Sequence, residues 1–102
     1  MNKADLYGFL AGEFADADFD GLSDAEVVRR CATPDATEWL RAVLTGGRAI
    51  LMAEPFPWRE IADQANRNLT GEAAVRQWLG AILNLLDREL DRLDRAPGQG
   101  GR

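Results

Sequence analysis

The pattern of apolar positions in the opening segment of the chain predicts a helix. In "ADLYGFLAGEFA", Leu6, Leu10 and Phe14 recur every four residues, which places their side chains on one face of a helix. Gly8 and Gly12 share the same spacing on another side. Each glycine weakens a helix by up to about 1 kcal/mol relative to alanine. We therefore expect a close neighbour on the glycine side of this helix.

A second, short helix is predicted over residues 24–32 by the signal at its start. Ser23 is a strong N-cap residue, and Glu26, three residues later, completes a capping box. The apolar residues that follow at helical spacing are Val27, Val28 and Cys31. These three residues are expected to face the core.

A third helix is predicted to begin at Pro34, because proline suits the first helical position after a cap such as Thr33. Gly46 and Gly47 interrupt this segment and leave two interpretations. Either one helix, bent at the glycines, reaches about Ala53, or two helices are joined by a tight turn. We favour the single helix because the apolar positions stay in phase across the glycines. Those positions are Trp39, Leu40, Val43, Leu44, Ile50 and Leu51.

The second half of the chain predicts a turn and two further helices. "EPFPW", residues 54–58, reads as a turn because each proline biases the residue before it away from the helical region. Pro57 then opens a helix through Arg67, and Thr70 caps a long last helix over about 71–94. This last helix carries a continuous apolar stripe. The stripe consists of Val75, Trp78, Leu79, Ile82, Leu83, Leu86, Leu90 and Leu93.

Together these elements predict an all-α fold, a compact bundle of four to five helices with a long C-terminal helix. No segment alternates with period two for long enough to form a strand. Residues 1–95 are assigned to a single helical domain and 96–102, "APGQGGR", to a disordered tail. Trp39 and Trp78 lie on the apolar stripes of the two longest helices. We therefore expect both to be buried and close to each other.

Composition and charge narrow the range of functions. The chain has 102 residues, 46% of them hydrophobic, and a net charge of -5. This charge argues against a nucleic-acid partner, because phosphate binding needs clustered Lys and Arg. No apolar run approaches the roughly 20 residues of a membrane span, and no segment resembles a signal peptide. Cys31 is the single cysteine, which fits a reducing compartment. We expect a cytoplasmic protein without a membrane partner.

The residue types that carry most enzymatic chemistry are scarce. The chain has no histidine, and its one serine, Ser23, precedes an acid rather than lying in a Gly-rich turn. Arg29 and Arg30 precede Cys31 and would favour its thiolate. The position of Cys31 on the apolar stripe nevertheless favours a small core residue. We predict that the chain is not an enzyme and has no cofactor.

An acidic stretch, "DADFDGLSDAE", follows the first helix. Its D-x-D-x-D-G opening matches the first half of an EF-hand calcium loop. A complete loop needs a bidentate acid at its twelfth position. Counted from Asp16, the twelfth position is Val27, and Glu26 falls one residue short. We predict no metal site, with weak calcium binding as the alternative.

The negative charge of the chain is concentrated in its first quarter. Residues 1–28 hold seven acids against Lys3, a net of -6, whereas the remainder holds ten acids against eleven arginines, a net of +1. One interpretation is a solvated loop with acids that favour a helix N-terminus. The other is an electrostatic landing surface for a basic protein, with Phe19 either in the core or as an anchor. The candidate partner-binding residues are Asp16, Asp18, Phe19, Asp20, Asp24 and Glu26.

The order of these motifs resembles a known family. "LYGFLAGEF", then "DADFD" and the capped helix "SDAEVV", is similar to the start of the small immunity proteins of contact-dependent growth inhibition systems. The later segment "EPFPWREIADQANRNLTGEAAVRQWLGAIL" also resembles them. The resemblance implies a cytoplasmic protein that binds and neutralises a cognate toxin domain by blocking its active site or an exosite. The toxin is often a nuclease, whose basic groove an acidic surface would match. No metal, cofactor or catalysis is implied.

A second class of function remains open. The stripe over residues 75–93 would also suit a helical homo-oligomeric module with a structural or regulatory role, such as a homodimer. Concentration-dependent mass, with the stripe buried between chains, would distinguish this alternative from a toxin inhibitor.

Overall fold

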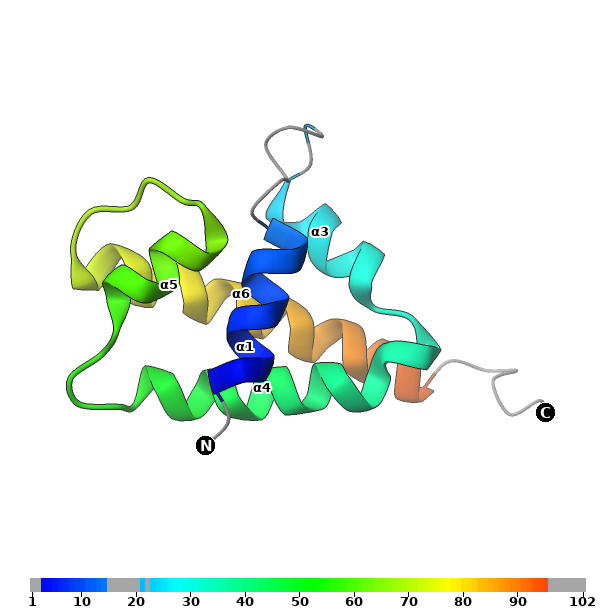
Figure 1. Cartoon of the computed structure of the whole chain (residues 1–102). Helices are drawn as coiled ribbons and strands as arrows, with labels where there is room; N and C mark the ends of the chain where they lie inside the picture. Colours follow the sequence, from blue (N-terminus) through cyan, green and yellow to red (C-terminus); the bar gives the residue numbers. More distant parts are fainter. Residues whose placement is uncertain (1–2, 15–20, 22, 96–102) are drawn as a thin grey trace.

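The structure of the chain, a computed structural model, describes residues 3–14, 21 and 23–95 (Figure 1). Within these residues it contains five α-helices and no strand, which confirms the predicted all-α fold. The last helix is also the longest, as predicted. The α-helices are α1 (Lys3–Phe9), α3 (Asp24–Cys31), α4 (Thr37–Leu51), α5 (Trp58–Ala65) and α6 (Glu72–Arg95). No helix of the described residues is both long and apolar enough to cross a lipid bilayer.

The first predicted helix forms, but in two parts. α1 passes directly into a π-helical segment, η1, over Leu10–Phe14. The face of this helix that was predicted from the four-residue spacing is buried, with Phe9 added to it. The expected close neighbour beside Gly8 and Gly12 is wrong. Both glycines are exposed, and a Cβ atom at either would meet nothing within 4 Å.

The capping box of α3 is confirmed. Ser23 Oγ accepts a hydrogen bond from the Glu26 backbone N–H at 3.2 Å, and Glu26 Oε1 accepts one from the Ser23 N–H at 2.8 Å. Val27 and Val28 are buried, while Cys31 is half-buried against the core. The local sequence therefore predicted both the start of α3 and its inward face.

The region around the glycine pair is one helix, as favoured from the sequence. A single 3₁₀ turn, η2 (Pro34–Ala36), precedes α4, and α4 continues through Gly46 and Gly47 without a break. Thr33 occupies the N-cap position of η2 and Pro34 the first helical position, as predicted, although the Thr33 side chain makes no capping hydrogen bond. α4 ends at Leu51, two residues before the predicted end.

α4 and α6 pack antiparallel along their length (Figure 1). Arg48 Nη2 lies 2.9 Å from Asp87 Oδ2. Arg41, about two turns earlier in α4, pairs with Asp94, about two turns later in α6. Gly47 permits the close approach. A Cβ atom there would lie 2.6 Å from Leu83 Cδ2.

The turn at residues 54–57 and the two following helices match the prediction apart from their boundaries. α5 is shorter than predicted and ends at Ala65, where Asn66 adopts a left-handed conformation with φ 55°. The predicted Thr70 cap of α6 is wrong. The first helical hydrogen bond runs from Val75 N–H to the Gly71 carbonyl, so Gly71, at φ 97°, occupies the position before the helix.

The core is one cluster to which all five α-helices contribute. α3 and α4 cover α6, and α1 lies against α4 and α5 (Figure 1). Most of the predicted stripe of α6 is buried inside the single chain. Its buried members are Val75, Leu79, Ile82, Leu83, Leu86 and Leu90. Residues 96–102, predicted to be a disordered tail, lie outside the described residues.

The expected contact between the two tryptophans is wrong. Trp39 is 36% exposed and packs its ring against the edge of Phe9, with centroids 5.9 Å apart. Trp78 is half-buried and contacts Phe14 at 5.6 Å. Phe9 and Phe14 contact each other at 5.4 Å. The two phenylalanine rings, in edge-to-face contact with each other and each with one indole, therefore lie between the two tryptophans.

Candidate functional site

The acidic stretch between η1 and α3 is the first candidate site. Four of its predicted partner-binding residues lie outside the described residues: Asp16, Asp18, Phe19 and Asp20. The other two, Asp24 and Glu26, lie in the first turn of α3. Their contacts show how the end of the stretch joins the fold.

Glu26 is held by the start of its own helix. Hydrogen bonding from the Ser23 backbone N–H is the main cause that lowers the pKa of Glu26, because the bond favours the charged carboxylate. The negative charge also lies at the N-terminus of α3, where a helix favours an anion. Glu26 thus performs the capping role that the sequence predicted, and its side chain remains exposed.

Asp24 is engaged by two residues from distant parts of the chain. Its Oδ1 lies 2.6 Å from Nη2 of Arg67, and its Oδ2 accepts a hydrogen bond from Trp78 Nε1 at 2.8 Å. The Asp24 side chain is 34% exposed and that of Arg67 is 16% exposed. Both carboxylate oxygens of Asp24 therefore have partners inside the fold.

Arg67 also contacts the residue that ends η1. Its guanidinium lies 5.8 Å from the centroid of the Phe14 ring and 5.9 Å from that of Trp78. A cation over an aromatic face is attracted by the ring quadrupole. Arg67 therefore binds Phe14 on one side of the acidic stretch and Asp24 on the other. The sequence did not indicate this role, because the ion pair joins residues 43 positions apart.

The structure shows how the last two positions of the incomplete calcium motif are used in the fold. Val27, which occupies the twelfth position of the motif, is 2% exposed and belongs to the core. Glu26, one position earlier, accepts the Ser23 N–H. Among the described residues, no group of three or more acidic, cysteine or histidine side chains is arranged to hold a metal ion.

The lone cysteine is not an activated nucleophile. Burial is the largest cause that raises the pKa of Cys31 to about 12, and a hydrogen bond with Glu13 raises it further than the nearby Arg30 lowers it. The thiolate is the reactive form of cysteine. At neutral pH Cys31 is therefore protonated, which agrees with its predicted place beside the core.

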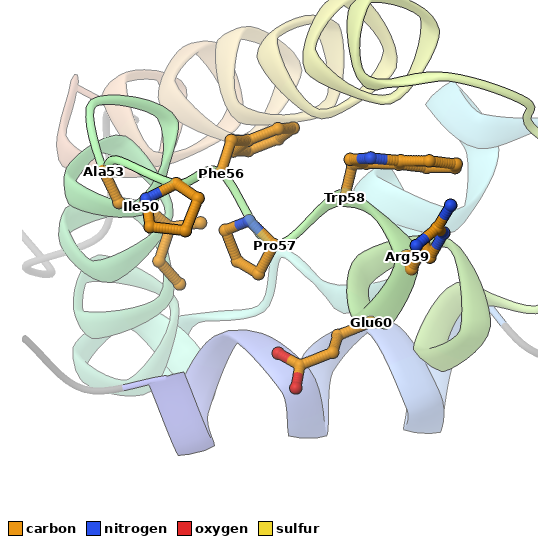
Figure 2. Close-up of a pocket in the computed structure, with 8 residues that line it drawn as sticks. Ile50, Ala53, Phe56, Pro57, Trp58, Arg59 and Glu60 are labelled. Atoms are coloured by element: carbon orange, nitrogen blue, oxygen red, sulfur yellow. The ribbon is translucent and has the colours of Figure 1, made fainter.

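A second candidate site is a hollow where α4 ends and α5 begins (Figure 2). The hollow has a volume of about 520 Å³, and the turn that was predicted from its prolines forms much of its wall. Its lining includes Ile50, Pro55, Phe56, Pro57 and Trp58. The sequence predicted the turn but not the hollow, because its walls come from separate elements.

No protein-family model matches the chain, and comparisons with curated proteins and with solved structures find no significant match.

Proposed function

We propose that this chain is a protein-binding module that acts as an immunity protein. In this proposal it binds a basic toxin domain, such as a nuclease of a contact-dependent growth inhibition system, and blocks its active site or an exosite. The proposal is supported by the charge distribution, with a net of -6 in residues 1–28 and +1 in the remainder. A surface of one sign steers a partner of the opposite sign and sets its orientation.

The observation that carries the proposal is the attachment of the acidic stretch to the fold. Arg67 contacts Phe14 before the stretch and Asp24 near its end. Contacts that hold both ends of a binding segment reduce the conformational freedom that the segment loses on binding, which lowers the entropic cost. Asp24 is already paired inside the fold, so we assign the direct contacts with the partner chiefly to Asp16, Asp18 and Asp20. Phe19 is their proposed apolar anchor.

The proposal requires no cofactor or catalysis. The acids would pair with Lys and Arg side chains that normally bind phosphate groups in the toxin. Charge alone seldom gives tight binding without buried anchors. We therefore expect Phe19 to contribute to the lifetime of the complex and the acids to its rate of formation. The proposed site of action is the cytoplasm of the cell that makes the protein.

The homo-oligomeric alternative receives less support. It needs the 75–93 stripe at an interface between chains, whereas most of the stripe is covered by α3 and α4 of the same chain. Among the leucines of α6, only Leu85 and Leu93 are half-buried rather than buried, so they are the leucines that a second chain could still cover. Sedimentation over a hundredfold concentration range tests this alternative directly. A concentration-dependent mass would support it.

The proposed function predicts that a basic toxin domain is encoded beside the gene, and the test uses that domain. Wild type is expected to form a 1:1 complex whose association slows as salt is added. The triple variant Asp16→Lys, Asp18→Lys, Asp20→Lys is expected to lose binding and protection of toxin-exposed cells. A matched control reverses three exposed acids elsewhere and should bind like wild type: Asp35→Lys, Glu38→Lys and Asp63→Lys. If the first triple variant binds and protects as wild type does, the acidic stretch is not the interface.

A further inference from the structure

The hollow beside the 54–57 turn has a largely apolar wall, with Arg59 and Glu60 as its charged members. Ile50 and Ala53 come from the end of α4 and the residues just after it, and two prolines and two aromatic residues complete the surface (Figure 2). Its volume of about 520 Å³ falls within the roughly 300–1,000 Å³ of typical small-molecule sites.

The backbone around the hollow offers little to an extended peptide. Pro55 and Pro57 have no N–H group. The N–H groups of Ala53 and Trp58 already donate to the carbonyls of Ile50 and Phe56, at 3.0 and 2.8 Å. An occupant therefore gains its contacts from apolar surface and from side chains, rather than from a ladder of main-chain hydrogen bonds. This argues for a compact ligand.

Two charged side chains line the hollow, and they differ in what they already bind. Glu60 Oε1 accepts a hydrogen bond from the Tyr7 hydroxyl at 2.8 Å. The Arg59 guanidinium lies 4.9 Å from the centroid of the Trp58 ring and forms no ion pair with any described residue. Figure 2 shows the two side chains next to each other. A guanidinium over an aromatic face is attracted by the ring and keeps N–H groups that can donate to a carboxylate.

We propose that this hollow is a binding site for a small apolar monocarboxylate. The apolar body of the ligand lies against the proline and aromatic wall, and its carboxylate pairs with Arg59. Glu60 disfavours a second negative charge on the ligand, which limits the class to monoacids. No residue that lines the hollow belongs to the acidic stretch, so the proposal does not depend on the proposed immunity function.

The test uses three probes that share one body and differ in charge: phenylacetate, phenylacetamide and phenethylamine. The ¹⁵N-labelled full chain is titrated with each while its amide resonances are followed. For a ligand of about ten heavy atoms, a dissociation constant on the order of 1 mM is expected for phenylacetate. Binding should be about tenfold tighter than for the amide or the amine. The shifted resonances should be those of Ile50, Ala53, Phe56, Trp58 and Arg59.

Two variants and one control complete the test. Arg59→Gln should weaken phenylacetate about tenfold, to the level of the amide, without changing amide binding. Arg88→Gln removes the same charge from an exposed position on α6 and should bind like wild type. Ala53→Phe fills the hollow and should weaken acid and amide alike. Equal affinity for the three probes, shifts located elsewhere, or an unchanged Arg59→Gln variant would each overturn the proposal, as would the absence of binding.

Discussion

The carboxylate of Asp24 accepts a hydrogen bond from the indole N–H of Trp78 at 2.8 Å, across 54 positions of sequence. This contact joins the first residue of α3 to the apolar stripe of α6. The other oxygen of Asp24 binds Arg67, whose guanidinium lies over the Trp78 ring. The three residues form one polar cluster at the edge of the core, beside the point where the acidic stretch ends.

Removal of the Asp24 carboxylate should destabilise the fold. Asp24→Ala leaves Trp78 without its acceptor and Arg67 without this carboxylate in a site where the Arg67 side chain is 16% exposed. A loss of about 2–3 kcal/mol in the free energy of unfolding is expected, as for hydrogen bonds to charged groups. Urea unfolding measures it. Asp35→Ala, at an exposed position, should stay within about 0.5 kcal/mol of wild type. Equal stability of the two variants would show that the cluster has no structural role.

The two tryptophans should differ in their contribution to stability. Trp78→Ala removes a half-buried ring together with its hydrogen bond to Asp24, and is expected to cost about 3–5 kcal/mol. Trp39 is 36% exposed, with Phe9 as its aromatic contact, so Trp39→Ala should cost about 1–2 kcal/mol. Melting temperatures of the two variants provide the comparison. A larger loss for Trp39→Ala would contradict the packing described for α4.

Local sequence signals correctly predicted those features of the fold that depend on residues close together in the chain. The Ser23–Glu26 capping box places the start of α3, because both hydrogen bonds lie within one turn. The unbroken apolar phase across Gly46 and Gly47 likewise predicted the continuity of α4. In both cases the signal lies within a single helix.

Features that depend on how helices meet were not predictable from periodicity. Trp39 shares a helix face with Gly46 and Ile50, which are buried, but it lies in the first turn of α4 where the core ends. Gly8 was expected near a neighbour, whereas the close approach occurs at Gly47. The pairing of Arg67 with the first acid of α3 spans distant segments and leaves no local signal.

The glycines provide a matched pair of substitutions. Gly47→Ala would place Cβ 2.6 Å from Leu83 Cδ2, and Leu83 is 1% exposed, so its methyl groups have little space to move. A net loss of about 1–2 kcal/mol is expected, because overpacking outweighs the higher helix propensity of alanine. Gly80→Ala, where nothing lies within 4 Å, should instead add up to about 1 kcal/mol. Urea unfolding of both variants measures the sign. Stabilisation by both would show that α4 and α6 can separate without cost.

Cys31 should react slowly in the folded chain. Because burial and Glu13 raise the pKa of its thiol to about 12, very little thiolate is present at pH 8. Labelling with a thiol reagent should be much slower than in urea, where the pKa returns toward 9.0. Equal rates in the folded and unfolded chains would contradict the burial of this side chain.

The same shift predicts a dependence of stability on pH. The folded chain holds the thiol proton to about pH 12, whereas the unfolded chain releases it near pH 9. The stabilising contribution of Cys31 is therefore complete below pH 9 and is lost as the pH rises from about 9 to 12. Cys31→Ala removes this contribution, so its stability should fall less steeply over that range than that of wild type. Parallel slopes would contradict the raised pKa.

Calcium should have no effect on stability, because a core residue occupies the position of an essential calcium ligand. The acid that an EF-hand needs at its twelfth position is replaced by Val27, which is 2% exposed and belongs to the core. Glu26, one residue earlier, is already bound to the Ser23 N–H. A ligand present at 100 times its dissociation constant adds about 2.7 kcal/mol to stability. We therefore expect millimolar calcium to change the unfolding free energy by less than about 0.3 kcal/mol. A clear rise in melting temperature with calcium that Asp16→Ala abolishes would show that the incomplete motif binds the ion despite the loss of its bidentate ligand.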